Sequence, residues 1–477
     1  MISRRDLLKL SALVGLPAPA PAQSLTDTAH PVTAPDYKIE IAATTLDLSP
    51  RHRLKTTAYN DQVPGALLRF KENRPVTIEV TNRTDRPEVV HWHGLFTPPD
   101  ADGAIEEGTP PIEPGSTARY SFTPRPAGFR WYHTHAMAMN DFTRGQYSGQ
   151  HGFIMVEPRA DPARYDQEFF IALHDWSGYL LATDDGAMNP SYTVATINGK
   201  AMGYGEPLRV KQGQRILLHV LNSSPTEVHW IALAGHSVHV VSLDGNSVPT
   251  PRTLPMLRLA PAERVSAIVE MNNPGIWVLG EVRKHVQALG MAVAVEYENM
   301  TGDARWDQPP ALTWNYEQFA ATPSPPSAPS APATNPEPSP PLLVPLVFES
   351  KFRGHGAMEA WTINGDSYPQ AKVAPLIQGR RYRLQFINKS MDDHPLHLHR
   401  HSFELRSLGV PLAAASRSAP RGGTPLDLHG ITKDVVLVDA QTRAEVEFTA
   451  DNPGATLFHC HQQNHMDYGF MMLLEYA

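Results

Sequence analysis

Short segments in which polar and apolar residues alternate follow one another along most of the chain. Examples are the segments 76–81 (VTIEVT) and 216–221 (ILLHVL), and prolines and glycines separate such segments. Alternation with a period of two residues is typical of β-strands that are buried on one face. No long stretch has the spacing of an amphipathic helix. The pattern therefore predicts an all-β protein made of β-sandwiches.

Internal repeats divide the chain into three parts. The tetrapeptide Thr-Ile-Asn-Gly stands at 196–199 and again at 362–365, and each copy precedes a strand that ends in an asparagine, Asn222 or Asn388. A comparable strand ends at Asn82. The length agrees, because 477 residues exceed one core and a domain takes roughly 150 residues. We predict three β domains, at 36–158, 165–318 and 343–477.

A proline-rich segment lies between the second and third parts. Residues 321–341 read ATPSPPSAPSAPATNPEPSPP. A segment of proline, serine and alanine cannot bury a core. We expect an extended linker or surface loop at 319–342.

The first residues, MISRRDLLKLSALVGLPAPAPAQS, have a positive start, a short apolar run and a small-residue end suited to cleavage after Ala22. They predict a signal peptide at 1–22. Arg4 and Arg5 lie in a context that resembles the twin-arginine export signal, which carries folded proteins. An ordinary secretory signal is the alternative. We expect a periplasmic protein without a membrane span, since no later segment approaches 18 apolar residues.

Charge and cysteine content narrow the classes of function. The net charge is -8 and the isoelectric point is about 6.3, which gives no basic patch for nucleic acid. Cys460 is the only cysteine, so it cannot form an internal disulfide. An exported protein must use this thiol for another purpose.

The repeats interpret one another at single positions. After Asn222 comes His229, and after Asn388 comes His394; aligned without gaps, alanines at 232 and 234 stand where His397 and His399 stand. Near the domain ends, Gly-Glu-Val at 280–282 matches His-Cys-His at 459–461, and the first part has His-Thr-His at 133–135. The middle part therefore has the scaffold but not the set of metal ligands.

Four histidine clusters stand out. They are His91 with His93, His133 with His135, His394 with His397 and His399, and His459 with Cys460, His461 and His465. Residues two apart on a strand point to the same face, so each His-x-His pair can offer two imidazoles to a metal. One tetrahedral zinc site would not use so many ligands.

Three residues remain after the four His-x-His pairs are counted: His394, Cys460 and His465. Two imidazoles and a thiolate are the ligands of a blue-copper electron-transfer site. His459 and His461 flank Cys460 directly, which gives an electron at the sulfur a short covalent path to the metals that these histidines bind.

On these four motifs the chain resembles the three-domain multicopper oxidases, a laccase-like family of cupredoxin repeats, in its bacterial periplasmic form. The resemblance implies three cupredoxin-like Greek-key β-sandwiches and four copper ions. It implies a type 1 copper at His394, Cys460 and His465, and a type 2 copper at His91 and His397. It implies a type 3 pair, one copper at His93, His133 and His461 and the other at His135, His399 and His459.

The resemblance also implies roles for residues near the coppers. Asp102 stands where related oxidases have a carboxylate that helps to deliver protons, and an Asp-Gly turn without such a role is the alternative. Phe470 stands at the axial position of the type 1 copper, where it cannot coordinate, so a high reduction potential is expected. Met466 replaces a proton-relaying glutamate, and whether Asp467 substitutes for it stays open.

The expected activity is oxidation of a small-molecule reductant, phenols and aromatic amines in the first place, coupled to reduction of O2 to water. His394 and His465 would accept electrons, Cys460 would conduct them and Asp102 would supply protons. The alternative is a metal oxidase that converts Cu(I) and protects the periplasm. A non-enzymatic envelope protein on the same fold ranks last, because no ligand is missing. We expect a monomer.

Overall fold

The computed structural model describes residues 34–158, 164–183, 186–321, 339–412 and 428–477. Met1–Pro35 forms a separate unit, and Asp36–Ala477 forms the body described below. The expected signal peptide and residues 322–338 of the expected linker lie outside the described residues. Among the residues that are described, none forms a helix long and apolar enough to cross a membrane.

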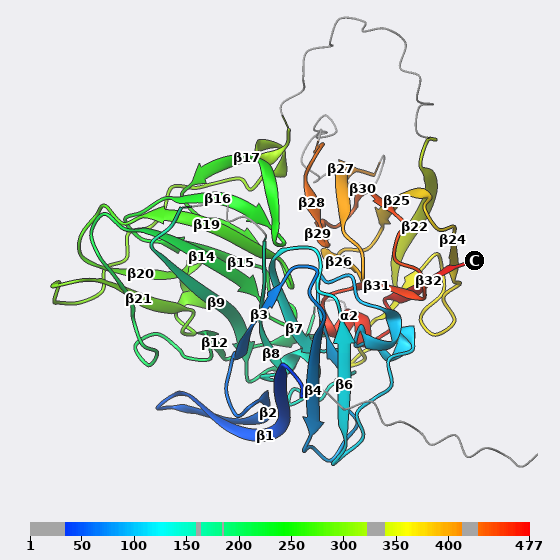
Figure 1. Cartoon of the computed structure of the whole chain (residues 1–477), viewed down its shortest axis with the longest axis horizontal. Coiled ribbons are helices and arrows are strands. Elements are labelled where there is room, and N and C mark those ends of the chain that lie inside the picture. The colour runs from blue at the N-terminus through cyan, green and yellow to red at the C-terminus, as the bar shows by residue number, and fades with distance from the viewer. Residues whose placement is uncertain (1–33, 159–163, 184–185, 322–338, 413–427) are drawn as a thin grey trace, which may run out of the picture. The chain divides into compact units, whose positions relative to one another are not determined.

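Two four-stranded sheets form the first sandwich (Figure 1, blue to cyan). Their orders are β2-β1-β4-β6 and β3-β8-β7-β5. The strands are β1 (Tyr37–Ser49), β2 (His52–Tyr59), β3 (Gly65–Lys71), β4 (Val76–Asn82), β5 (Val90–His91), β6 (Thr117–Phe122), β7 (Gly128–Thr134) and β8 (His151–Glu157). Three 3-10 turns lie in its loops: η2 (Pro99–Ala101), η3 (Ile105–Glu107) and η4 (Gly145–Tyr147).

The middle sandwich has a six-stranded sheet, β12-β9-β14-β19-β16-β17, and a five-stranded sheet, β13-β21-β20-β15-β18. Its strands are β9 (Gln167–Trp176), β12 (Val194–Ile197), β13 (Leu208–Val210), β14 (Arg215–Asn222), β15 (His229–Leu233), β16 (Val238–Leu243), β17 (Asn246–Leu254), β18 (Leu257–Leu259), β19 (Arg264–Glu270), β20 (Ile276–Glu281) and β21 (Ala292–Tyr297). A hairpin of β10 (Tyr179–Ala182) and β11 (Met188–Ser191), helix α1 (Lys284–Gln287) and turn η5 (Tyr316–Phe319) accompany them.

The third sandwich repeats the strand order of the middle one. Its sheets are β23-β22-β25-β30-β27-β28 and β24-β32-β31-β26-β29. Its strands are β22 (Leu342–Lys351), β23 (Ala360–Ile363), β24 (Ala374–Leu376), β25 (Arg381–Asn388), β26 (His394–Leu398), β27 (Phe403–Pro411), β28 (Thr432–Lys433), β29 (Val435–Val438), β30 (Thr442–Thr449), β31 (Thr456–Cys460) and β32 (Met471–Tyr476), with helix α2 (Gln463–Asp467) between the last two. The prediction of an all-β fold of sandwiches is confirmed.

The repeated motifs have the same structural use in each copy. In both Thr-Ile-Asn-Gly turns the asparagine and glycine have positive φ, 51° and 73° at Asn198 and Gly199, and 54° and 91° at Asn364 and Gly365. Two successive positive φ angles are those of a tight type I′ hairpin turn, which favours Asn-Gly. The sequence repeat is therefore a turn requirement.

The asparagines that end β4, β14 and β25 also have one role. Asn82, Asn222 and Asn388 are each fully buried, and each amide Nδ2 donates to main-chain oxygens of the following loop and of a distant segment. Each side-chain oxygen accepts from the main-chain N–H two residues on. A buried amide that satisfies loop groups in this way explains why asparagine recurs at the strand end.

The alternating pattern predicts exposure of one face, and the structure differs at β14. In β4 the buried and half-buried positions alternate as predicted, whereas seven of the eight residues of β14 are buried. The ring of His219 lies 5.0 Å from that of Phe129, in the first sandwich, and 4.7 Å from that of Phe170. Packing of one sandwich on another therefore buries the face that alternation leaves to solvent.

Candidate metal centre

The structure brings the eight histidines of the His-x-His pairs into one buried set, which we call the histidine cluster. They come from the ends of β5 and β7 in the first sandwich and of β26 and β31 in the third. The groups whose ligand atoms lie within 4.8 Å of one another are His91, His93 and His397; His93, His133 and His461; and His135, His399 and His459. Two pairs of rings stack across the junction between the first and third sandwiches. The ring centres of His91 and His399 are 3.9 Å apart, and those of His93 and His397 are 3.8 Å apart.

Main-chain oxygens hold the outer nitrogens of four of these rings. In each, Nδ1 donates to a carbonyl, at 2.7 to 2.9 Å. The pairs are His91 with Asp102, His133 with Thr134, His397 with Asp434, and His459 with Cys460. A hydrogen bond at one nitrogen fixes the ring and leaves the lone pair on the other.

Carboxylates hold two further rings. His399 donates from Nδ1 to Oδ2 of Asp102 at 2.8 Å, and His93 donates from Nε2 to Oδ1 of Asp434 at 3.2 Å. His93 is thus turned the other way, with Nδ1 as its inner nitrogen. For His135 and His461 the described residues provide no hydrogen bond at the outer nitrogen.

The inner nitrogens fit a metal. Within the described part of the chain, Nε2 of His91, His133 and His397 and Nδ1 of His93 are buried without a hydrogen-bond partner. Nε2 of His459 lies 3.0 Å from Nε2 of His399 and 3.4 Å from Nε2 of His135. Buried polar atoms without partners are costly. Metal ions bound between these nitrogens would satisfy their lone pairs.

Protonation agrees with this fit. Burial lowers the pKa of seven of the eight imidazoles, His93, His133, His135, His397, His399, His459 and His461, that of His459 to about 3. These rings are therefore neutral at neutral pH, which is the form that binds a metal.

The remaining three predicted ligands form a second buried group, which we call the thiol group. Nδ1 of His394 and Nδ1 of His465 lie 3.1 Å apart, and Sγ of Cys460 lies 3.7 Å from the first and 3.5 Å from the second. His394 is oriented by Ser390, whose Oγ lies 2.8 Å from its Nε2. Burial raises the pKa of the Cys460 thiol, so binding of a metal here must release a proton.

Phe470 packs against the thiol group. Its fully buried ring lies 4.7 Å from the ring of His394 and 5.9 Å from that of Trp361. Met471, the neighbour that could have supplied a thioether, packs in a different core cluster with Leu457 and Met466. Among the described residues near the thiol group, the side chain at the expected axial position is therefore an aromatic one.

Asp102 is a fully buried carboxylate that bridges the two sandwiches. Its Oδ2 lies 3.0 Å from Nδ1 of His91 and 2.8 Å from Nδ1 of His399, and Thr97 donates to its Oδ1. Burial by itself would raise the pKa of Asp102, but His91 and the hydrogen bond from His399 hold it well below its usual value. The residue is more than a turn former, because it orients one histidine from each sandwich.

Glu107 was missed in the sequence. It is buried in η3, its Oε1 accepts from the main-chain N–H of Leu457 at 2.5 Å and lies 3.6 Å from Nδ1 of His399. Burial, and then the charge of Asp102, raise its pKa well above the usual value. The two adjacent carboxyls therefore differ in protonation. The only sequence signal was their closeness in the chain.

Met466 and Asp467 both contact residues of the first sandwich. Met466 is buried with Ala104, Leu457 and Met471. Asp467 accepts from the main-chain N–H of Met139 at 2.6 Å and from Nε2 of Gln463 at 2.8 Å. Its carboxylate thus ties α2 to a loop of the first sandwich.

At the equivalent position of the middle sandwich, charged side chains form ion pairs in place of a set of metal ligands. His229, which aligns with His394, lies between Asp175 and Glu281, the latter aligned with Cys460. His236 and His401, aligned with each other, bond to equivalent tyrosines, Tyr297 at 2.7 Å and Tyr476 at 2.8 Å. The equivalence deduced from the repeats is therefore preserved in three dimensions.

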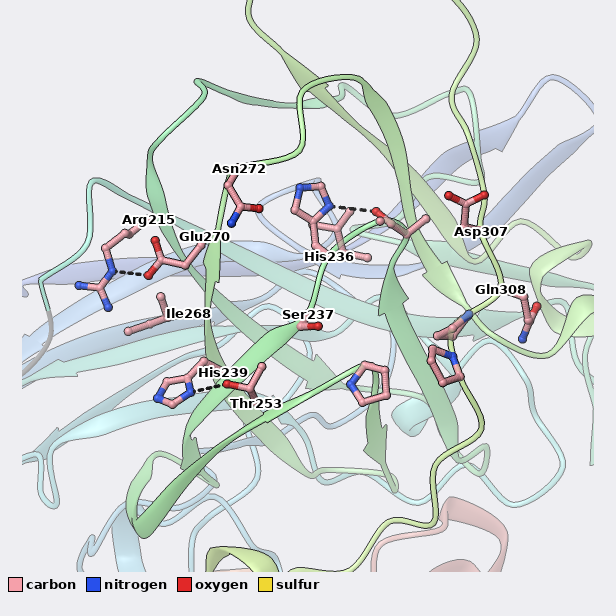
Figure 2. Close-up of a pocket in the computed structure, with 16 residues that line it drawn as sticks. Arg215, His236, Ser237, His239, Thr253, Ile268, Glu270, Asn272, Asp307 and Gln308 are labelled. Carbon is pink, nitrogen blue, oxygen red and sulfur yellow. Dashed lines mark hydrogen bonds and ion pairs between the residues drawn. The ribbon is translucent and has the colours of Figure 1, made fainter.

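A surface pocket of about 720 Å³ also lies in the middle sandwich. Figure 2 shows its polar side chains, among them the ion pair of Arg215 with Glu270 and the hydrogen bond of His239 with Thr253. The predicted metal ligands do not line it. The pocket is therefore separate from the chemistry of the histidine cluster.

Comparison with known proteins identifies the family of the chain. Models of the multicopper oxidase family match residues 40–161, 168–297 and 341–477. The chain is 29% identical to the multicopper oxidase MmcO of Mycobacterium tuberculosis, over 89% of this chain and 83% of that protein. It is 24% identical to copper resistance protein A of Escherichia coli, over 98% of both chains, and 25% identical to laccase-4 of Thanatephorus cucumeris, over 97% and 91%.

A solved structure agrees. The multicopper oxidase from Pseudomonas thermotolerans is 25% identical, with a TM-score of 0.68 over 92% of this chain and 98% of that one. The chain belongs to the multicopper oxidase family and is a copper-dependent oxidoreductase. Its cofactors are four copper ions, one of type 1, one of type 2 and a type 3 pair, and the buried histidine groups suit them.

Proposed function

We propose that the protein oxidises phenols and aromatic amines, one electron at a time, and reduces O2 to water, as a laccase does. One observation carries the proposal: His459, Cys460 and His461 are consecutive. Cys460 belongs to the thiol group, and its two neighbours belong to the histidine cluster. An electron taken up at the thiol group therefore has a covalent path of a few bonds to the histidine cluster. When bound, the copper ions supply the storage of single electrons and the reduction of O2.

Each residue has a proposed role in this scheme. The thiol group holds the type 1 copper, and His91 and His397 hold the type 2 copper. His93, His133 and His461 hold one type 3 copper, and His135, His399 and His459 hold the other. The convergence of inner nitrogens and the fixed outer nitrogens support these roles. Phe470, whose ring packs on that of His394, would lie beside the type 1 copper without coordinating it.

Asp102 is proposed to deliver protons. Reduction of O2 consumes protons inside a buried site, where the supply must come from side chains. Oδ2 of Asp102 already contacts one imidazole of each sandwich, and its low pKa keeps it ionised, so it can accept a proton and pass it on at the edge of the histidine cluster. Glu107 lies beside it.

A second candidate is a metal oxidase acting on Cu(I). The observation that favours it is Met391, whose side chain is 80% exposed. It precedes Asp392, whose Oδ2 lies 4.0 Å from Nε2 of His465. A thioether is a soft ligand that suits Cu(I), and a relative named copper resistance protein A aligns with 98% of this chain.

The setting of the enzyme is also a proposal. We infer export to the periplasm by the twin-arginine route from the sequence of residues 1–22, and action as a monomer with three domains at 36–158, 165–318 and 343–477. Nucleic acid is not a partner at a net charge of -8.

The test is a steady-state comparison of a phenol and Cu(I) on the copper-loaded protein, with O2 uptake recorded. Turnover of the phenol supports the first proposal, whereas rapid Cu(I) turnover without phenol turnover replaces it by the second. Cys460→Ser is the control, because it removes the thiolate but little volume. It should abolish both the intense blue absorption and O2 uptake, and a wild-type protein loaded with copper but not blue would contradict both proposals.

A further inference from the structure

Asp434 is a buried carboxylate at which all three sandwiches meet. It precedes β29 of the third sandwich and is fully buried. Its Oδ1 accepts from Nε2 of His93, in the first sandwich, at 3.2 Å. Both of its oxygens accept from Arg264, in β19 of the middle sandwich, at 2.6 Å each. Sequence comparison pointed to none of these contacts.

The same residue orients a second histidine through its main chain. The carbonyl of Asp434 accepts from Nδ1 of His397 at 2.7 Å. The rings of His93 and His397 form one of the two pairs that stack across the junction, with planes 12° apart. The side chain and the main chain of one residue thus set two neighbouring imidazoles, and the inner nitrogen of each is left without a hydrogen-bond partner among the described residues.

Arg264 holds the Asp434 carboxylate in one orientation. Two parallel N–H to oxygen bonds fix the plane of a carboxylate, which a single point charge cannot do. The guanidinium is itself held, because Nη1 donates to the carbonyl of Ala262 and Nη2 to that of Asp244, each at 3.1 Å. Arg264 is fully buried, so water does not compete with these bonds.

Gly94 shows how closely this arrangement approaches the histidine pair. It follows His93 at a φ of +82°, and a Cβ at this position would lie 2.6 Å from Oδ2 of Asp434 and 2.9 Å from Nη2 of Arg264. A side chain at residue 94 would push the carboxylate and the guanidinium aside. The glycine therefore makes room for the contact.

We propose that Arg264 is a positioning residue for the copper site, acting through Asp434 to fix the ring of His93. The inference rests on the proposed role of His93 as a copper ligand. It gives the middle sandwich, whose described histidines join none of the metal groups, a part in the copper chemistry. Loss of such an outer partner weakens metal binding by roughly 10- to 100-fold.

The same buried ionic layer supplies a matched control. Glu263 precedes Arg264, is 3% exposed and bonds to Lys433 at 3.0 Å. Within the described part of the chain, its carboxylate bonds to Ala260, Tyr316 and Lys433, and not to Asp434 or to a proposed ligand. Glu263→Gln therefore disturbs the layer without releasing the carboxylate that holds His93.

The test compares Arg264→Lys, Arg264→Gln and Asp434→Asn with Glu263→Gln, all as full chains loaded with copper. Copper content is titrated with a chelator, and the electron paramagnetic resonance spectrum is recorded with the blue absorption as the internal standard. We expect the three variants to keep the blue absorption, lose copper from the histidine cluster at about 10- to 100-fold lower chelator concentration, and change the non-blue part of the spectrum. Lysine should fail like glutamine, because it keeps the charge but not the paired bonds.

Retention of wild-type copper affinity and spectrum in Arg264→Lys or Asp434→Asn, on folded protein, would overturn the proposal. An equal loss in Glu263→Gln would also overturn it, since the effect would then be one of stability. If one variant does not fold, the other decides. A wild-type protein that binds no copper in the histidine cluster would instead contradict the proposed function.

Discussion

The charge on His229 should make the stability of the middle sandwich depend on pH above neutrality. The imidazole is fully buried, with Nε2 at 2.8 Å from Asp175 and Nδ1 at 3.0 Å from Glu281. Burial by itself would lower its pKa, but the two carboxylates raise it from 6.5 to about 9. The ring is therefore an imidazolium at neutral pH, held between two acids.

The size and sign of this pH dependence follow from the difference between the pKa of His229 in the folded and unfolded protein. The difference between 9 and 6.5 is 2.5 pKa units, and at about 1.36 kcal/mol per unit it corresponds to about 3 kcal/mol. Because the folded pKa lies above the unfolded value, this stability is complete below pH 6.5 and is lost as the pH rises through 9. The same ion pair, together with Arg283, lowers the pKa of Glu281 to about 2, so the interaction of His229 with Glu281 is counted once.

Hydrogen exchange measured by mass spectrometry suits this prediction, because it reports the free energy of opening separately for each segment of a protein. Peptides from β15 and β20 report the local free energy of opening between pH 6.5 and a value above 9. The wild-type protein should lose about 3 kcal/mol over this range. His229→Gln should start less stable, by roughly 3 kcal/mol, because it removes the positive charge between two buried carboxylates and leaves Asp175 without its ion pair, and should change little with pH.

His236→Gln is the matched control. His236 is a half-buried histidine of the same sandwich whose pKa burial lowers, so it titrates below the range of the experiment. This variant should keep the wild-type slope. If wild-type protein and His229→Gln show the same pH dependence, the reasoning is refuted.

Three further substitutions test the sites and the core. Phe470→Met should lower the reduction potential of the type 1 copper, because a thioether can donate to Cu(II); a redox titration of the blue band that finds no decrease would count against the axial position. Asp102→Asn should slow O2 reduction by on the order of 100-fold while substrate still bleaches the blue band under anaerobic conditions, and slowing of both steps would contradict the proton role. Phe386→Ala should cost about 3 to 5 kcal/mol, since the ring is fully buried 5.4 Å from that of Phe458; a loss below about 1 kcal/mol in denaturant unfolding would show that the third core re-packs.

The class of fold and the ligand candidates could be predicted from local sequence patterns. Strand alternation has a period of two and needs no knowledge of neighbours, and the Asn-Gly turns at 198–199 and 364–365 need only positive φ. The repeats then aligned His394 with His229 and Cys460 with Glu281, so one copy of the sequence indicated what the other lacks. The eleven predicted ligands are brought together in two buried groups.

Contacts between parts far apart in the chain could not be predicted in this way. The burial of β14 on both faces depends on Phe129, and the protonated state of His229 depends on Asp175, 54 residues away. Charged residues such as Lys433 and Asp434 are usual at a strand end exposed to water, and nothing in the local sequence indicates that they are buried.

The sequence by itself therefore determined the class of fold, the ends of three equivalent strands and the identity of the ligand candidates, because each depends on residues close in the chain or repeated in it. Only the tertiary structure decided which nitrogen of each imidazole faces inward and what holds the other. Those choices depend on Asp102, Asp434 and Arg264, which lie in three different sandwiches, and a low-dielectric junction makes their hydrogen bonds strong.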